Sequence, residues 1–228
     1  LKRVIERYPF LPALIIMLVL LALNGIWQPR SVSLVGITGL VKTYLALMLL
    51  AVAQTYVVYA GDIDLSAGAI VSLVNVVIVA FMAAMGGSAF SVFAAMVLGL
   101  GVGLACGVVN GVVVAAFRLQ AIVATFATSI FFTALALAIM PVAGTPAPAA
   151  FWRTYGGRVV EIPFVFWAAM VLAIMLYLLA RTRLAIQLLA VGDDAQGAYQ
   201  SGLPVTAIRI RGYALCGELR LGEPAVFD

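Results

Sequence analysis

The chain has 228 residues, of which 65% are hydrophobic and 10% are charged, and its formal net charge is +4. Soluble domains carry about 25% charged residues, so this chain has too few charges to cover a water-exposed surface. The excess apolar residues are expected to face lipid or other apolar helices. The basic residues lie in short segments between apolar runs, which favours membrane topology over nucleic-acid binding as the reason for the positive charge.

The composition also argues against most enzyme classes. The chain has no histidine and two cysteines, Cys106 and Cys216, which lie far apart within apolar stretches. Zinc sites and Ser-His or Cys-His catalytic pairs therefore lack candidate residues, and burial is the ordinary explanation for the two thiols. The nucleotide-binding pattern GxxxxGK[ST] is absent as well. We predict no catalytic residue, no metal site and no cofactor held by this chain.

Apolar segments long enough to cross a bilayer recur along the chain. A spanning helix needs about 20 mainly apolar residues, and lipid requires its backbone polar groups to bond within the helix. The sequence predicts an all-α, polytopic transmembrane helix bundle with six complete spans and a partial seventh at Thr206–Gly217. The six are Phe10–Trp27, Thr43–Tyr59, Ala67–Met85, Ala89–Ala116, Ala121–Val142 and Pro163–Ala180. Segment Ser31–Lys42 either lies along the interface or extends the second span.

The distribution of basic residues predicts the orientation. With a cytoplasmic N-terminus, the inner side receives Lys2, Arg3, Arg7, Arg118, Arg181 and Arg183. The Gly86-Gly87-Ser88 turn and the segment Ala143–Glu161 then fall outside, although Arg153 and Arg158 in that segment are exceptions to the positive-inside rule.

Glycines recur every four residues in the fourth predicted span, at Gly99, Gly103, Gly107 and Gly111. This period places them on one face of a helix, where the missing side chains let another helix approach closely. The pattern predicts tight helix packing and carries no information on substrate.

The first polar segment between spans reads GDIDLSAG, from Gly61 to Gly68, and contains Asp62, Asp64 and Ser66. Charges at membrane depth are costly, and glycine permits a sharp break in a helix. One explanation is a loop in which Asp64 or Ser66 caps the next helix. The other is a broken helix beside a polar path, because irregular backbone at membrane depth is tolerated only beside a cavity or within protein.

The second polar segment is Arg181–Val205, about 25 residues that the orientation places inside. Asp193 and Asp194 can cap a short helix over Ala195–Ser201, which Gly202 would end. A short helix outside the membrane suits docking to a cytoplasmic partner, and a solvated connecting loop is the alternative.

The C-terminal segment Glu218–Asp228 differs from the rest, since it reads ELRLGEPAVFD. The seventh span, from Thr206, would be about half the required length at Gly217. This pattern indicates a single incomplete transmembrane domain over residues 1–217 and a truncated or frame-shifted end at 218–228. The alternative is a short last helix whose tail leaves the bilayer.

Three segments resemble the ribose/xylose/galactose class of ABC permeases. GDIDLSAGAIVSL (Gly61–Leu73) resembles its GGIDLSVGS-type signature, and NGVVVAAFRLQAIVATFAT (Asn110–Thr128) resembles its NGLLVAKLKIQPFIATLGT-type segment. AVGDDAQGAYQSGLPVTAIRIRGYALCG (Ala190–Gly217) resembles its cytoplasmic loop and the following span. The three come in the family's order and spacing.

The resemblance implies a permease subunit of an ATP-binding cassette importer, multi-pass in the bacterial inner membrane, that moves a monosaccharide into the cytoplasm. It implies three partners: a cytoplasmic ATP-binding subunit, a second permease subunit, identical or not, and a periplasmic sugar-binding protein. ATP would be bound and hydrolysed by the partner, so the permease itself would not be an enzyme. The implied translocation-path candidates are Gly61, Asp62, Asp64, Ser66, Gly68 and Asn110.

The family's EAAxxxG-like coupling loop maps onto this chain at Asp193, Asp194, Gln196, Gly197, Ala198 and Gly202. Three positions depart from the family pattern: Gln196 replaces an acid, Gly197 replaces an alanine, and Asp62 stands where glycine is usual. Two alternatives remain open. One is an ion-coupled secondary transporter, for which Lys42, Asp62 and Asp64 are the candidate buried ionisable groups. The other is an inactive, truncated permease fragment.

Overall fold

In the computed structural model, the described residues, 11–142, 147–159 and 162–219, are almost entirely helical. The elements in chain order are α2 (Leu11–Trp27), η1 (Pro29–Val32), α3 (Leu34–Tyr59), α4 (Ala67–Ala84), α5 (Ala89–Gly111), η2 (Val112–Ala116), α6 (Ala121–Ile139), α7 (Ala149–Tyr155), β1 (Arg158–Val159), β2 (Ile162–Pro163), α8 (Phe164–Ala180), α9 (Arg183–Asp193), α10 (Ala195–Gln200) and α11 (Val205–Glu218). The expectation of an all-α fold is confirmed. β1 and β2, of two residues each, pair antiparallel beside the helices.

Several helices are long and apolar enough to cross a membrane. Among the described residues these are α3, α4, the continuous α5–η2 helix and α6, and α8 with α9 passes as a fifth span bent by 59°. The expected six complete spans and partial seventh are therefore not supported as counted. The reason is length, since α2 and α8 have 17 residues each and α11 has 14, against about 20 for a full span.

The chain divides into two compact units, Leu1–Tyr44 and Leu45–Asp228. In the first unit, Ser33 starts α3: its hydroxyl accepts a hydrogen bond from the Gly36 amide at 3.2 Å. From Leu34 on, the segment Ser31–Lys42 thus continues the second predicted span as one helix of 26 residues, while Ser31 and Val32 belong to η1. The basic residues Lys2, Arg3 and Arg7, used for orientation, lie outside the described residues.

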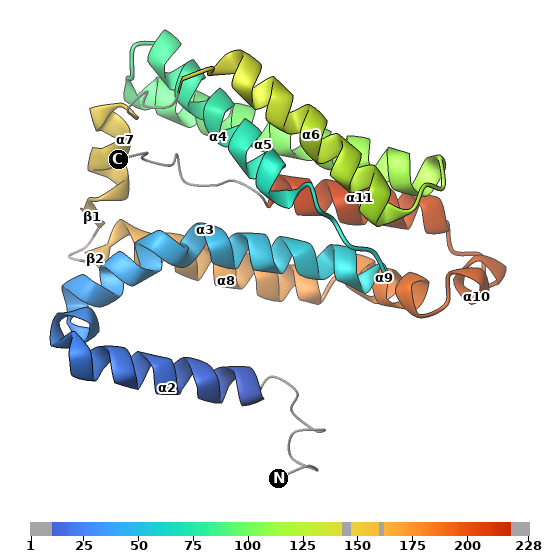
Figure 1. Cartoon of the computed structure of the whole chain (residues 1–228), viewed down its shortest axis with the longest axis horizontal. Coiled ribbons are helices and arrows are strands. Elements are labelled where there is room, and N and C mark those ends of the chain that lie inside the picture. Colours follow the sequence, from blue (N-terminus) through green and yellow to red (C-terminus); the bar gives the residue numbers. More distant parts are fainter. Residues whose placement is uncertain (1–10, 143–146, 160–161, 220–228) are drawn as a thin grey trace. The chain divides into compact units, whose positions relative to one another are not determined.

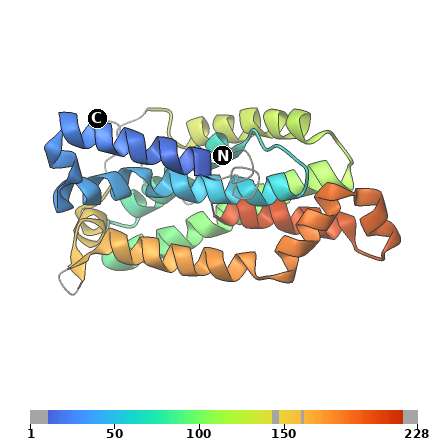
Figure 2. The same cartoon turned by 90° about the horizontal axis from the view of Figure 1, so that it is seen from below.

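The second unit is built on two apolar cores. In one, α4 packs against both α5 and α6 (Figures 1 and 2), with Val74, Ile78 and Phe132 buried between them. The other joins the end of α3 and the start of α6 to α9, α10 and α11, and includes Leu188 and Ile208. The second core is the one that positions both polar segments found in the sequence.

Close packing of α5 on α11 follows the four-residue glycine period. A Cβ atom added at Gly103 would collide with the Gly217 carbonyl oxygen, and one at Gly107 with the Tyr213 carbonyl oxygen. At Gly111 it would lie 2.8 Å from the Ile210 Cα. The missing side chains therefore let two helix backbones touch. The remaining glycine of the series, Gly99, is also buried.

The turn expected at Gly86-Gly87-Ser88 is confirmed. Gly86 and Gly87 have φ of 75° and 66°, a region that favours glycine. Ser88 is the N-cap of α5, and its hydroxyl accepts a hydrogen bond from the Ser91 amide at 3.1 Å.

The segment expected to be one polar loop, 181–205, is mostly helical. Arg183–Asp193 forms α9, an amphipathic helix that buries Ala185, Leu188 and Val191. The sequence carried this signal as apolar residues three apart. The helix expected at Ala195–Ser201 is present as α10.

The structure describes only part of the C-terminal segment and part of the segment predicted to lie outside the membrane. α11 ends at Glu218, close to the expected end of the partial span near Gly217, and 220–228 lie outside the described residues. The segment Ala143–Glu161 contains α7 and β1, while 143–146 and 160–161 lie outside the described residues.

Candidate functional site

The break between α3 and α4 is an irregular segment held inside the protein. Gly61 has φ of 77°, which permits the sharp exit from α3. After it, Asp62 is 8% exposed, Asp64 is 2% exposed and Ser66 is fully buried. The segment is therefore not a solvated loop. Its buried backbone meets the condition under which irregular structure is tolerated at membrane depth.

Asp64 and Ser66 form the centre of a buried hydrogen-bond network. The Asp64 Oδ1 accepts bonds from the Ser66 amide at 2.8 Å and from the Ser66 hydroxyl at 2.6 Å. The Asn110 side chain on α5 donates to the same hydroxyl at 2.6 Å, and the Gln54 side chain on α3 donates to the Asp64 carbonyl at 2.6 Å. Three helices therefore meet at this break.

The expected capping role is only partly right. Ser66 is the residue before α4, but its side chain makes no cap hydrogen bond to the helix. Asp64 instead accepts from the Ser66 amide, which holds the turn that leads into α4. A Cβ added at Gly68 would meet nothing within 4 Å, so the structure shows no requirement for glycine there.

Sequence reasoning missed Thr125 on α6. Its hydroxyl accepts a hydrogen bond from the Leu65 amide at 3.0 Å and donates to the Ala121 carbonyl at 2.8 Å. The side chain is fully buried and ties α6 to the break. The available signal was a hydroxyl in an otherwise apolar helix, within the resembling segment that ends at Thr128.

Sequence reasoning also missed the partner of Asp62. The guanidinium of Arg209 on α11 contacts both carboxylate oxygens, with Nε–Oδ2 at 3.1 Å and Nη2–Oδ1 at 2.5 Å. The Arg209 side chain is 25% exposed against 8% for Asp62. This fork-to-fork geometry neutralises the charge that the sequence places at the break. Arg209 was visible as a basic residue among apolar ones in the seventh segment.

The predicted coupling residues gather around α10. Asp193 ends α9, and the Asp194 side chain caps α10 by accepting from the Gln196 amide at 3.0 Å. Ala198 is buried in the second core, whereas Tyr199 beside it is 73% exposed. α10 therefore presents one face to the protein and leaves the other accessible.

Two glycines of this element have clear structural reasons. A Cβ at Gly197 would lie 2.5 Å from the Asp194 Oδ2, so glycine at this position leaves room for the capping side chain. Gly202 has φ of 83° and ends the turn after α10, as the sequence predicted.

The coupling element and the break touch each other through two glycines. A Cβ at Gly192, near the end of α9, would collide with the Tyr59 carbonyl oxygen and lie 2.9 Å from the Gly61 amide nitrogen. The residue directly before the predicted coupling residues is thus in backbone contact with Gly61, the first of the predicted path residues. Within the described residues, no group of three or more His, Cys, Asp or Glu could hold a metal ion.

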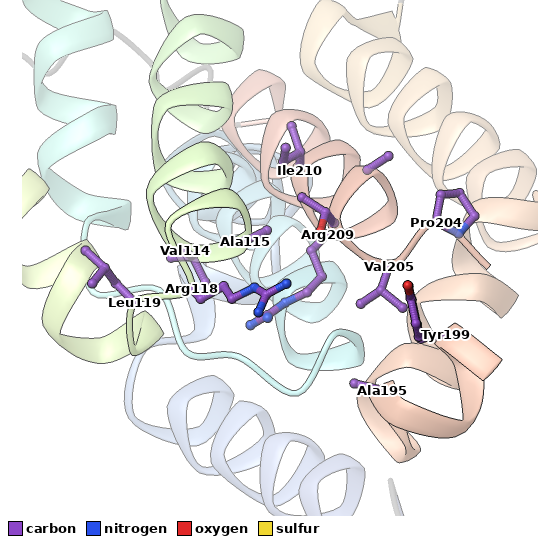
Figure 3. A pocket seen from close by; sticks show the side chains of 12 residues that line it. Val114, Ala115, Arg118, Leu119, Ala195, Tyr199, Pro204, Val205, Arg209 and Ile210 are labelled. Atoms are coloured by element: carbon purple, nitrogen blue, oxygen red, sulfur yellow. The ribbon is translucent and has the colours of Figure 1, made fainter. Parts of the chain in front are cut away.

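A cavity of about 710 Å³ lies beside α10. It is bounded by the end of η2, the loop after it, α10 and the start of α11 (Figure 3). Arg118 and Arg209 both line it, and Arg118 has φ of 56°, which is uncommon for a residue with a side chain. The cavity brings together the Arg118 loop and α10, which the sequence analysis assigned to the same side of the membrane.

Comparisons with known proteins identify the family of this chain. The family described as "Branched-chain amino acid transport system / permease component" matches residues 36–219. The chain is 33% identical over 220 residues to the autoinducer 2 import system permease protein LsrC of Yersinia pseudotuberculosis serotype O:1b, covering 94% of this chain and 61% of that protein. It is 32% identical, with the same coverage, to the protein of that name from Yersinia pestis strain Pestoides F. No solved structure matches.

Proposed function

We propose a function from one premise: the chain belongs to the family of permease components of branched-chain amino acid transport systems. We propose that it is a transmembrane permease subunit of an ATP-binding cassette importer in the bacterial inner membrane. Its relatives are named as import system permeases, which supports transport into the cytoplasm. The chain spans 61% of the length of these relatives. Transport is therefore proposed for the complete transporter of which this chain is one part.

The observation that carries the proposal is the contact between α9 and the α3–α4 break. An importer must convert ATP hydrolysis on a partner into a change of the membrane path. Here the Gly192 backbone lies against Tyr59 and Gly61, directly before the buried segment that begins at Asp62. A displacement of α9 and α10 would therefore reach the break without an intermediate element, because packed backbones transmit displacement.

The proposed docking element is α10 with its flanking residues, Asp193–Gly202. It is capped by Asp194, anchored by buried Ala198 and exposed at Tyr199. A short, capped helix with one free face suits the cytoplasmic ATP-binding subunit as its partner. This subunit would bind and hydrolyse ATP, and the permease would hold no cofactor.

The proposed translocation path runs beside Asp64, Ser66 and Asn110. The Asn110 side chain is almost fully buried, and its Oδ1 has no hydrogen-bond partner among the described residues. A buried acceptor without a partner is costly, and a hydroxyl group of a passing solute would satisfy it. The proposed substrate is a monosaccharide, and the names of the relatives add autoinducer 2 as a second candidate.

The proposed topology keeps the N-terminus in the cytoplasm. α2 and α8, with 17 residues each, are proposed as full spans at the lower end of the usual length, and α11 as a partial seventh. The proposed partners are a second permease subunit and a periplasmic binding protein in addition to the ATP-binding subunit.

The ion-coupled alternative loses support at one residue. Asp62 was a candidate for an unpaired buried carboxylate that binds an ion, but it forms a two-bond pair with Arg209. A carboxylate in such a pair is already compensated, and ion coupling would require that pair to open.

The test is ATP hydrolysis by the complete transporter in proteoliposomes, assembled from the gene products of the same locus. Replacing Asp193–Gly202 by a Gly/Ser linker of equal length is expected to abolish the stimulation of hydrolysis by the binding protein. Inserting a second Gly-Gly-Ser after Ser88, in the turn at the other end of α4, serves as the control and is expected to retain it. Unchanged stimulation in the first variant would rule out the coupling role. Solute uptake without ATP, driven by an ion gradient, would favour a secondary transporter.

A further inference from the structure

The cavity beside α10 carries a positive charge that the proposed path does not use. Among the residues that line it, the charged ones are both arginines, Arg118 and Arg209. In Figure 3 both side chains point toward the middle of the cavity, and Tyr199 lies at its edge beside Val205. Thr206, in the first turn of α11, is also among the residues that line the cavity.

The two arginines differ in their balance of charge. Arg209 is neutralised by Asp62 behind it. Arg118 is exposed and makes no ion pair within the described part of the chain. Asp194 starts α10 but does not line the cavity, because its side chain turns back to cap the helix. The cavity thus has an excess of one positive charge and suits an anionic group.

The backbone at Arg118 supports a specific placement of this charge. A φ of 56° is sparsely populated for residues other than glycine and is costly unless the surroundings enforce it. Arg118 lies in the loop between η2 and α6, and its side chain points into the cavity beside α10 (Figure 3). Strained backbone of this kind is concentrated at ligand-holding positions.

The neighbours of Arg118 indicate what carries the anion. Phe117, before Arg118, is 69% exposed, and Leu119, which follows it and lines the cavity, is 52% exposed. Large exposed apolar side chains therefore precede and follow Arg118 in the chain. A soluble anion would leave these two side chains in water. A phospholipid would place its phosphate against the guanidinium and its acyl chains against Phe117 and Leu119.

We propose that the cavity lined by Arg118 and Arg209 binds the phosphate of an anionic phospholipid headgroup. The guanidinium fork matches phosphate geometry with two parallel hydrogen bonds. Basic pockets between transmembrane helices on the cytoplasmic side are established headgroup sites. A lipid held there contacts η2, α10 and α11 together and would steady the position of α10. The inference requires the chain to lie in a membrane, and it does not require transport.

The test is lipid binding to the purified full chain in detergent, measured by native mass spectrometry without any ATP-binding subunit. The probes are phosphatidylglycerol, phosphatidylcholine and soluble glycerol 3-phosphate. The wild-type protein is expected to bind phosphatidylglycerol more tightly than phosphatidylcholine. Arg118→Asn, which removes the charge and tolerates positive φ, is expected to weaken phosphatidylglycerol binding about fivefold, the effect of one basic residue at an anionic membrane surface.

Two further variants make the result specific. Arg118→Lys keeps the charge but loses the fork, and is expected to bind more tightly than Arg118→Asn and more weakly than the wild type. Arg183→Gln removes an exposed arginine that does not line the cavity and is expected to bind like the wild type. Equal affinity of wild type and Arg118→Asn would overturn the proposal. So would an equal loss in Arg183→Gln, or displacement of phosphatidylglycerol by an equal concentration of glycerol 3-phosphate. Because no ATP is involved, failure of the coupling experiment leaves this measurement unaffected.

Discussion

At the scale of single residues, the Asp62–Arg209 pair shows how this chain tolerates a charge near membrane depth. The two residues are 147 positions apart, and both carboxylate oxygens are bonded. A buried ion pair is weak evidence for stability, because removing both charges from water offsets much of their attraction. Removing only one partner of the pair is more costly, because the remaining charge then stays buried without compensation. The pair therefore makes the two residues interdependent.

This interdependence gives a prediction for Asp62. Asp62→Asn is expected to lower the free energy of unfolding by about 3 kcal/mol, the lower end of the range for breaking a buried pair, because Arg209 is 25% exposed. The double variant Asp62→Asn with Arg209→Gln is expected to recover most of this loss. Equilibrium unfolding in detergent with increasing SDS measures both. A double variant as unstable as the sum of the two single variants would show that the residues act independently.

The same residues mark what a sequence can and cannot provide. The two aspartates and Ser66 were recognisable as functional candidates, because polar residues are rare between apolar segments. Their partners Thr125 and Arg209 were not assigned. A hydrogen bond between the break and a helix 60 residues or more away depends on tertiary packing, which local pattern does not encode.

At the scale of helices, the glycine series of α5 was predictable as a packing face, but its partner was not. Period and residue type determine which face of a helix can be approached. The identity of α11 as the approaching helix requires the fold. The amphipathic helix α9 was missed for a related reason: its polar face made a segment of the chain look like a loop, although Ala185, Leu188 and Val191 follow helical spacing.

Two glycines of α5 provide a matched test of this packing. Gly107→Ala is expected to destabilise the protein by about 1–3 kcal/mol, because its Cβ would collide with the Tyr213 carbonyl on α11. Gly101→Ala places a methyl group where nothing lies within 4 Å. It is expected to be neutral or to stabilise the helix by up to about 1 kcal/mol through higher helix propensity. Unfolding in SDS compares the two, and equal effects would show that α5 and α11 do not pack closely in the membrane.

At the scale of the whole chain, composition and hydropathy predicted a helical membrane protein with correct positions for most spans. The number of spans was predicted less accurately, because α2 and α8 fall at the lower limit of spanning length and α8 bends by 59° into α9. Resemblance in three segments pointed to the permease class, and the family match over residues 36–219 shows the family. The contact between Gly192 and Gly61, on which the proposed coupling rests, joins two of those segments and is a property of the fold.

The cavity beside α10 and the length of α4 together predict the membrane topology. Arg118 and Tyr199 line one cavity, so both must be reached from the same side of the membrane. Met85, half exposed at the end of α4, follows a helix of 18 residues that starts at the break, which places it about 27 Å away along the helix axis. That distance is close to the thickness of the hydrocarbon core. Met85 is therefore expected on the opposite side.

Cysteine labelling of membrane vesicles checks this topology. Arg118→Cys and Tyr199→Cys are expected to react with a membrane-impermeant maleimide in inside-out vesicles, and Met85→Cys in right-side-out vesicles. The unmodified chain is the control, because Cys106 and Cys216 are both buried and should react slowly in either. Labelling of Arg118→Cys and Tyr199→Cys from opposite sides would contradict the shared cavity. Labelling of both from the outer side would keep the fold but reverse its orientation, and α10 could then not meet an ATP-binding subunit in the cytoplasm.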